Sequence, residues 1–306
     1  MKQHQLAKGF IPVMLTPFYS NGKIDFETLS KLTEKYIEWG AVGLFANCLS
    51  SEMFELSSDE RLQVIETVLK VADGRVPVVA TGTFGDSIDE MAEFSNKIWS
   101  LGVDAVIVLN NLLASEQETD AIFLERFYHW MELTPGVKFG FYECPVPYKR
   151  LISLEVFQEL LPSGRFIYHK DTSLSISNIK DKVIAKQNST LGIYDAYMVH
   201  AVDALKLGIN GLSCIQGNFF PELVVWLCHN FDRDDNKILV DEIQQFFIDS
   251  MEVIHQSYPV SAKYVLSRRG FDIGLTTRRN VGQLSSKQKH QLDLLIIKGE
   301  LLNANL

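Results

Sequence analysis

The chain has 306 residues, of which 46% are hydrophobic and 22% are charged. These proportions are those of a soluble globular protein and exclude a disordered or fibrous one. The formal net charge of −9, with no basic stripe, argues against nucleic acid or an anionic membrane as the main partner, although local positive groups could bind a small anion. The start, Met1 to Lys8, is polar, and no apolar run approaches the length of a membrane span, so we expect a cytoplasmic protein.

The four cysteines are Cys48, Cys144, Cys214 and Cys228, and they are far apart in the sequence. No Cys-x-x-Cys pair occurs, so the spacing indicates neither a zinc site nor a disulfide framework. We expect all four to be buried free thiols.

Short β-forming runs alternate along the chain with longer segments of helical periodicity. The expected strands are Phe10–Leu15, Val42–Asn47, Val76–Thr81, Asp104–Leu109, Lys138–Tyr142, Phe166–Lys170, Thr190–Tyr194 and Gly211–Ile215. The helical segments between them include Phe26–Trp39, Ser58–Ala72, Ile88–Leu101, Thr119–Leu133 and Ala196–Leu207. Strand then helix, repeated about eight times, predicts a (β/α)₈ TIM barrel, in which strands buried on both faces read as continuous apolar runs. An open doubly wound sheet would give a similar alternation, but no Gly-rich dinucleotide loop follows the first strand.

The strand pattern ends after Asn218. The helical segments that follow are Phe219–His229, Val240–Ser257, Ser261–Arg269 and Ser286–Leu302. We therefore expect a barrel over residues 1–231 and a small helical C-terminal extension over residues 232–306. Thr276–Gly282 reads as a polar turn inside this extension.

The stretch Arg165–Thr172 reads as a buried strand that ends on a lysine, Lys170. Desolvation disfavours an ammonium and lowers its pKa, and a neutral amine can attack a carbonyl carbon to form a Schiff base. Alternatively, Lys170 could reach solvent or pair with Asp171. The preceding His169 should point to the opposite face of the strand, and we expect it to have a structural role.

Active sites of such barrels lie at the C-terminal ends of the strands. Those ends carry Lys170, Tyr142 and the Leu49-Ser50-Ser51 turn. Lys170 would be the nucleophile and Tyr142 a phenol that passes a proton, while the turn offers hydroxyl and backbone N–H donors for a carboxylate. Each could instead be an ordinary core tyrosine or turn serine. Their shared position at one mouth of the barrel favours function.

Five motifs, in this order and spacing, resemble the family of dihydrodipicolinate synthase and N-acetylneuraminate lyase, the class I Schiff-base aldolases, over essentially the whole chain. They are Thr16-Pro17-Phe18 with Asn21-Gly22-Lys23-Ile24-Asp25; Asn47-Cys48-Leu49-Ser50-Ser51-Glu52 with Leu56-Ser57-Ser58-Asp59-Glu60-Arg61; Phe141-Tyr142-Glu143-Cys144-Pro145; Tyr168-His169-Lys170-Asp171-Thr172; and Leu207-Gly208-Ile209-Asn210-Gly211 leading to Gly217-Asn218.

The resemblance implies an imine between Lys170 and pyruvate or a related 2-oxo acid, with Tyr142 as the proton relay. It also implies that the Leu49-Ser50 turn binds the substrate carboxylate, and that the protein is a homotetramer or homodimer. No cofactor and no metal are expected, since an iminium is itself an electron sink. Ser51, Glu143 and Asn218 are further substrate-binding candidates. Glu143 could line the pocket and select a hydroxylated substrate, or pair with Arg150 at the rim.

Three departures from the family pattern bear on the reaction. Cys48-Leu49-Ser50-Ser51-Glu52 stands for Gly-Thr-Thr-Gly-Glu, so Ser50 must replace a threonine hydroxyl. Asn110-Asn111-Leu112 stands for Pro-Tyr-Tyr, which removes the tyrosine normally lent across the dimer interface. Pro147 occupies the place of the arginine that binds the second substrate in dihydrodipicolinate synthases, although Lys149 or Arg150 could supply a substitute charge.

These departures favour a lyase, aldolase or dehydratase acting on pyruvate or a 2-keto-3-deoxy sugar acid. Two alternatives stay open. One is dihydrodipicolinate synthase itself, and the other is a sensory descendant that binds a 2-oxo acid without turnover.

Overall fold

Eight parallel strands alternate with helices along the chain, in a computed structural model that describes residues 6–187 and 189–306. Residues 1–5, which begin the Met1 to Lys8 segment and the expected barrel unit, lie outside the described residues. The strands are β1 Gly9–Phe10, β2 Leu44–Phe45, β3 Val78–Thr81, β4 Ala105–Leu109, β5 Phe139–Tyr142, β6 Phe166–Asp171, β7 Gly192–Asp195 and β8 Gly211–Leu212. All eight expected strands are found, and every pairing between them is parallel.

The sheet closes on itself, which confirms the barrel and excludes the open doubly wound sheet. β1 pairs with β8, and the segment after β1 meets β2 through a parallel bridge between Val13 and Phe45. The Phe45 N–H donates to the Pro12 carbonyl at 3.0 Å, and the Met14 N–H donates to the Phe45 carbonyl at 3.1 Å. The first strand is shorter than expected because Pro12 has no N–H to donate to a sheet ladder.

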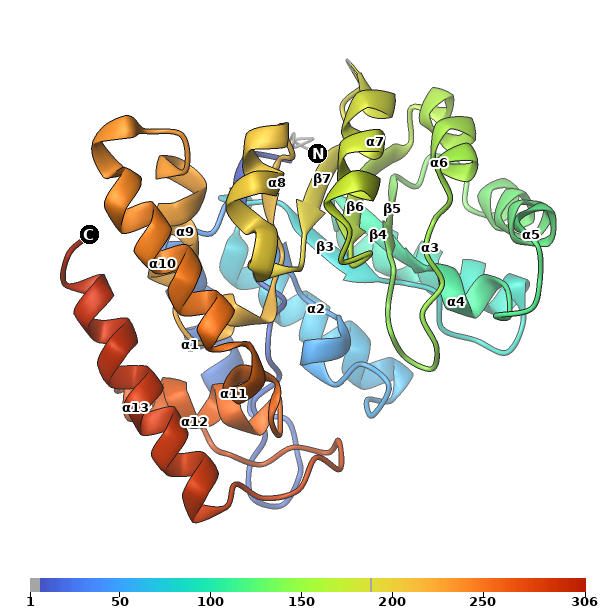
Figure 1. The fold of residues 1–306 in the computed structure, drawn as a ribbon. Coiled ribbons are helices and arrows are strands. Elements are labelled where there is room, and N and C mark those ends of the chain that lie inside the picture. The colour runs from blue at the N-terminus through green and yellow to red at the C-terminus, as the bar shows by residue number, and fades with distance from the viewer. Residues whose placement is uncertain (1–5, 188) are drawn as a thin grey trace.

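Helices surround the barrel and continue beyond it (Figure 1). They are α1 Phe26–Glu38, α2 Ser58–Ala72, α3 Ile88–Leu101, α4 Asn110–Leu113, α5 Asp120–Leu133, α6 Leu154–Leu160, α7 Ile176–Lys186, α8 Ala201–Leu207, α9 Pro221–Asn230, α10 Lys237–Asp249, α11 Met251–His255, α12 Val260–Arg268 and α13 Ser286–Asn303. The expected segments Ser58–Ala72 and Ile88–Leu101 are confirmed at both ends. Ser57 caps the first of these, because its hydroxyl accepts the Glu60 N–H while the Glu60 carboxylate accepts the Ser57 N–H.

Two helices differ from expectation for local reasons. The segment expected at Val240–Ser257 is two helices, α10 and α11, which break at Ser250. The Ser250 hydroxyl donates to the Phe246 carbonyl at 2.6 Å, a contact that often bends helices. α8 begins at Ala201 rather than Ala196, because the Asp195 carboxylate accepts the Tyr197 N–H at 2.9 Å and forms a turn there.

Apolar side chains fill two layers. Those inside the barrel include Phe45, Ile107, Tyr168 and Tyr194, and they form one cluster beneath the C-terminal strand ends. A larger cluster packs the outer strand faces against the helices. Lys170 therefore lies above closely packed apolar side chains, which exclude water from the interior of the barrel.

The last four helices, α10 to α13, gather beside α8 and α9 at one side of the barrel (Figure 1). This agrees with an all-helical end of the chain, while the boundary near residue 232 stays a prediction. Among the residues described, no helix has both the length and the apolar character needed to cross a membrane.

Candidate active site

Lys170 and Tyr142 lie side by side at the C-terminal ends of β6 and β5. The two residues are paired in register, so their side chains project from the same face of the sheet. Lys170 is 4% exposed, and its Nζ lies 4.3 Å from the centroid of the Tyr142 ring and 5.9 Å from that of Phe45. The nucleophile and the phenol of the sequence prediction are thus neighbours.

The amine of Lys170 is buried without a compensating carboxylate. Burial lowers its pKa, although the neighbouring Cys48, Cys144 and Cys214 act in the opposite direction. Within residues 6–187 and 189–306, no hydrogen bond or ion pair engages Nζ; Asp171 instead binds Lys182. A lowered pKa increases the fraction of neutral amine, which is the nucleophilic form.

The Leu49–Ser51 turn presents two backbone donors at the same mouth. No acceptor among the described residues takes the N–H of Leu49 or Ser50, whereas the Ser51 N–H donates to the Cys48 carbonyl. The Ser51 hydroxyl lies 2.7 Å from the Met14 carbonyl and 2.8 Å from that of Ala46, and it accepts the Cys48 N–H. Ser51 therefore fixes the turn from behind, while Leu49 and Ser50 face the mouth.

A cavity of about 570 Å³ opens above Lys170. Its lining residues come from the strand ends and from the C-terminal helices: Leu49, Ser50, Tyr142, Pro145, Lys170, Thr172, Leu174, Ala196, Tyr197, Ile215, Met251, Glu252, His255, Tyr258 and Arg279. Four of the seven predicted site residues, Leu49, Ser50, Tyr142 and Lys170, share this lining. Ser51, Glu143 and Asn218 are outside it.

Tyr258 is a cavity residue that the sequence reasoning missed. It lies just after α11, and its hydroxyl accepts a hydrogen bond of 2.6 Å from Asn218 Nδ2. The Ser50 side chain lines the same cavity. Asn218 Oδ1 accepts from the Tyr36 hydroxyl, and Nδ2 also donates to the Val13 carbonyl at 2.9 Å. Asn218 therefore orients Tyr258 from behind.

Arg279 is a second cavity residue that was missed. It belongs to the Thr276–Gly282 segment, which reads in the sequence only as a polar turn. Neither Tyr258 nor Arg279 belongs to a periodic pattern in the sequence. Both reach the cavity because the C-terminal extension folds over the mouth of the barrel.

Glu143 is turned away from the cavity and into a buried ionic cluster behind β6. Its carboxylate accepts from the Lys182 ammonium at 2.8 Å and from the Thr172 N–H at 2.8 Å. Arg150, the alternative partner, binds Asp120 instead. Accordingly, we do not retain Glu143 as a substrate-binding residue.

The same cluster contains the expected structural histidine. Glu143, His169 and Asp171 each direct one ligand atom to a common point, as for a metal ion. The Lys182 Nζ occupies that point, 2.7 Å from Asp171 Oδ2 and 3.0 Å from His169 Nε2. Burial alone would lower the Lys182 pKa, but the charges of Glu143 and Asp171 raise it. An internal ammonium thus fills the place that a cation would take, so these residues do not fit a metal ion.

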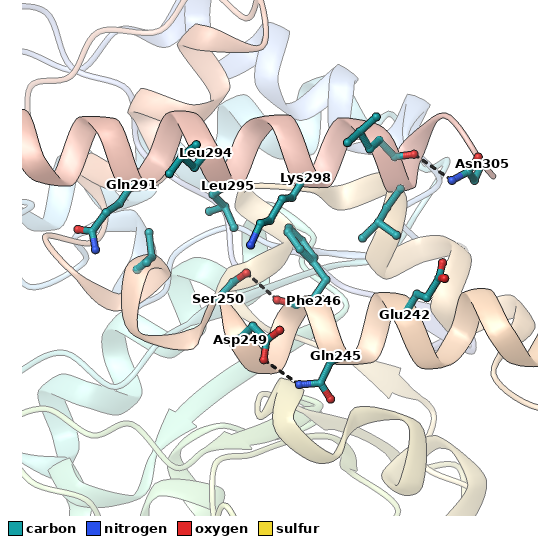
Figure 2. A pocket seen from close by; sticks show the side chains of 13 residues that line it. Glu242, Gln245, Phe246, Asp249, Ser250, Gln291, Leu294, Leu295, Lys298 and Asn305 are labelled. Carbon is teal, nitrogen blue, oxygen red and sulfur yellow. Dashed lines mark hydrogen bonds between the residues drawn. The ribbon is translucent and has the colours of Figure 1, made fainter.

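A different hollow, of about 550 Å³, lies between α10 and α13 (Figure 2). Leu294, Leu295 and Lys298 line it from α13, and Phe246 and Asp249 line it from α10. It is mainly apolar, and among the described residues that line it no hydroxyl or amine is paired with a carboxylate or a histidine.

Comparison with known proteins identifies relatives along nearly the whole chain. The profile of the Dihydrodipicolinate synthetase family matches residues 6–298. The 4-hydroxy-tetrahydrodipicolinate synthase of Marinobacter nauticus is 27% identical over 289 residues, which cover 92% of this chain and 95% of that protein. The putative 2-dehydro-3-deoxy-D-gluconate aldolase YagE of Escherichia coli is 25% identical over 228 residues, 74% of each chain.

Solved structures agree with the fold. The chain superimposes on Escherichia coli YagE in complex with pyruvate with a TM-score of 0.85 at 22% identity, covering 96% of this chain and 99% of that one. A monomeric dihydrodipicolinate synthase variant gives a TM-score of 0.87 at 18% identity, covering 98% and 99%. Because the family profile spans residues 6–298, the protein belongs to the dihydrodipicolinate synthetase family.

Proposed function

We propose that this protein is a Schiff-base lyase that acts on pyruvate or a 2-keto-3-deoxy sugar acid. One observation carries the proposal: the Lys170 amine is buried and unpaired among the described residues, in a cavity that it shares with the Tyr142 phenol and the free N–H groups of the Leu49–Ser50 turn. The two relatives described above, a synthase and an aldolase, support this reaction class.

The chemistry begins when the neutral amine of Lys170 attacks the keto carbon of the substrate. The carbonyl oxygen takes up a proton to give a carbinolamine, which then loses water, so a C=N bond replaces the C=O bond. The resulting iminium accepts an electron pair from the neighbouring carbon. In the cleavage direction, the hydroxyl one carbon further along loses its proton, the carbon–carbon bond breaks, and an aldehyde leaves.

The Leu49–Ser50 turn would hold the carboxylate next to the keto group. Two N–H groups directed at one anion stabilise it in a cavity that is largely shielded from water. Fixing this end of the substrate places its keto carbon against Lys170. The turn would therefore bind the carboxylate while the amine attacks the keto carbon next to it in the same substrate.

Tyr142, Ser50 and Tyr258 would form the proton relay within one chain. Burial raises the pKa of Tyr142 and of Tyr258, so both phenols stay protonated and can donate. Asn218 already donates to the Tyr258 oxygen, which leaves the Tyr258 proton available to Ser50, a residue that lines the same cavity. Tyr258 would thus do the work of the tyrosine that Asn110-Asn111-Leu112 lacks, without a partner subunit.

The proposal is tested by trapping the imine. The protein is incubated with pyruvate and borohydride, digested, and examined by mass spectrometry for an adduct on Lys170. Turnover is then measured on a panel of 2-keto-3-deoxy sugar acids, and on pyruvate with aspartate semialdehyde. An adduct without any turnover would indicate a sensory binding protein, and the absence of an adduct would exclude the enzyme.

Replacing Tyr142 by phenylalanine should slow turnover roughly 10²-fold or more while the imine still forms, because the variant loses a positioned proton donor but keeps the amine. Steady-state kinetics and adduct yield measure the two effects separately. Unchanged turnover would remove Tyr142 from the mechanism.

Tyr258→Phe should reduce kcat by about 10- to 10²-fold with little change in adduct formation, because only the relay beyond Ser50 is cut. Tyr264→Phe is the matched control, since its hydroxyl binds Asp293 on α13 and takes no part in the cavity lining. A Tyr258 variant as active as the control would contradict a relay within one chain.

We further propose a cytoplasmic homodimer or homotetramer. Four buried, unpaired cysteines support a reducing compartment. The division into residues 1–231 and 232–306 is also a proposal. It is supported by the all-helical structure after β8, and Tyr258 and Arg279 of this extension contribute to the cavity lining.

A further inference from the structure

Arg279 places an unpaired cation in the lining of the cavity that contains Lys170. Its guanidinium has no hydrogen bond or ion pair to any residue that the structure describes, and part of its surface is exposed. It also borders an adjoining hollow of about 720 Å³ formed by its own loop. A cation that is left free beside a small-molecule cavity is a ready partner for an anionic group of the ligand.

The backbone of Arg279 is firmly held. The buried Glu52 carboxylate accepts the N–H groups of both Arg278 and Arg279, at 2.6 Å and 2.8 Å, and receives Lys263 Nζ at 3.2 Å. Glu52 ends the Leu49–Ser51 turn in a left-handed conformation, with φ of 58°. The segment that carries Arg279 is therefore tied directly to the turn proposed to bind the substrate carboxylate.

Neighbouring cations are already engaged. The Arg278 guanidinium binds Glu60 at 2.6 Å and 2.7 Å, and Lys149 Nζ donates to the Thr172 carbonyl at 2.7 Å. The Lys170 amine would be consumed by the imine. Among the lining residues, Arg279 alone retains a permanent free positive charge.

Two titratable groups of α11 face the same cavity, Glu252 and His255. The Glu252 carboxylate accepts from Gln256 Nε2 at 3.3 Å, and His255 Nδ1 lies 2.7 Å from the Met251 carbonyl. Neither forms an ion pair with Arg279 among the described residues. The negative charge of Glu252 would repel an incoming anion, so removing that charge provides a second test of the inference.

The geometry points to Arg279 as the residue that selects substrates with a second anionic group, a carboxylate or a phosphate, beyond the 2-oxo acid end. This inference rests on the proposed function, because it requires the imine at Lys170 to fix the near end of the substrate. The first carboxylate would occupy the Leu49–Ser50 turn, and the second would meet the Arg279 guanidinium elsewhere in the cavity lining. The C-terminal extension would thereby supply a positive charge in place of the arginine that Pro147 replaces.

The test compares ligands that differ only in the distal charge. 2-Oxoglutarate is matched with 2-oxopentanoate, and 2-oxoadipate with 2-oxohexanoate, as competitors of pyruvate for the borohydride-trapped adduct on Lys170. For phosphate, glyceraldehyde 3-phosphate is compared with glyceraldehyde as the aldehyde partner, with pyruvate consumption as the measurement. We expect the charged member of at least one pair to be favoured about 10- to 100-fold, the scale of a charge-assisted hydrogen bond.

Arg279→Gln should remove that preference while an adduct with pyruvate still forms, and Arg279→Lys should keep part of the preference. Glu252→Gln should increase the preference, since it removes the opposing charge. Arg233→Gln makes the same charge change at an exposed site outside the cavity and should have no effect. Equal binding of both members of every pair, or a preference that survives in Arg279→Gln, would overturn the inference. If pyruvate forms no adduct with the unmodified protein, the proposed function itself fails, which is a distinguishable result.

Discussion

Lys170→Ala is expected to abolish the borohydride-trapped adduct and to lower turnover by at least about 10⁴-fold, the scale seen when a covalent nucleophile is removed. The residual cavity still offers the Leu49–Ser50 turn and the phenol of Tyr142, but no group remains that can form an imine. The truncation also removes an ammonium that is costly to bury, so the variant should fold. Mass spectrometry of the trapped protein and steady-state kinetics measure the two losses, and circular dichroism checks the fold.

Lys149→Ala is the matched control for this variant. Lys149 is also a lysine near the mouth, but its Nζ donates to the Thr172 carbonyl and is not part of the cavity lining. The control should form the adduct at the rate of the unmodified protein. An adduct that persists in Lys170→Ala, or that disappears in Lys149→Ala, would show that the wrong amine has been assigned.

The sequence placed Lys170 and Tyr142 at neighbouring strand ends, because both positions depend on local patterns. β5 and β6 both begin as apolar runs; Tyr142 is the last residue of β5, and Lys170 is the last but one of β6. Once adjacent parallel strands are in register, residues at equivalent positions must share a face. The amphipathic helices around the barrel were equally accessible, since their periodicity and caps lie within single segments.

Tyr258 and Arg279 could not be located in this way. Each lies in an irregular segment of the extension, and what brings it to the mouth is contact between residues far apart in the chain. Glu52 binds the backbone of Arg279, and Asn218 binds the hydroxyl of Tyr258. Such long-range hydrogen bonds leave no periodic trace in the sequence.

Glu143 illustrates the opposite error, in which a residue next to the site was expected inside it. Tyr142 faces the interior of the barrel, so its neighbour in the strand must face outward. There, Glu143 meets Lys182 from α7, 39 positions further along the chain. The orientation of Glu143 was therefore predictable from strand alternation, whereas its partner was not.

The buried ionic cluster behind β6 fixes the strand that carries Lys170. Asp171 follows Lys170 directly and is completely buried. Burial alone would raise the pKa of Asp171, but hydrogen bonding to His169 and the charge of Lys182 hold it well below its ordinary value. The amine on one face of the strand is thus free because the carboxylate on the other face already has a cation.

Lys182→Met should therefore lower the free energy of unfolding by about 3–5 kcal/mol at neutral pH, the cost of breaking a buried ion pair on one side. Glu143 and Asp171 would be left as unpaired carboxylates in the protein interior. Urea denaturation measures the loss. Lys180→Met, at an exposed position of the same helix, should change stability by no more than about 0.5 kcal/mol.

The stability difference between Lys182→Met and the unmodified protein should shrink as the pH falls. In the unmodified protein, the lowered pKa of Asp171 contributes stability that is complete above the unfolded value of about 3.9 and is lost as the pH drops toward the folded value. In the variant, burial without the ammonium should raise the pKa of Asp171. A raised pKa destabilises the folded state at pH values where the unfolded carboxyl is ionised, and it has no effect once both states are protonated. Both effects make the stability difference larger as the pH rises. Denaturation should therefore show a large difference at pH 7 and a smaller one at about pH 4. A difference that is the same at both pH values would mean that Lys182 stabilises the fold by packing alone.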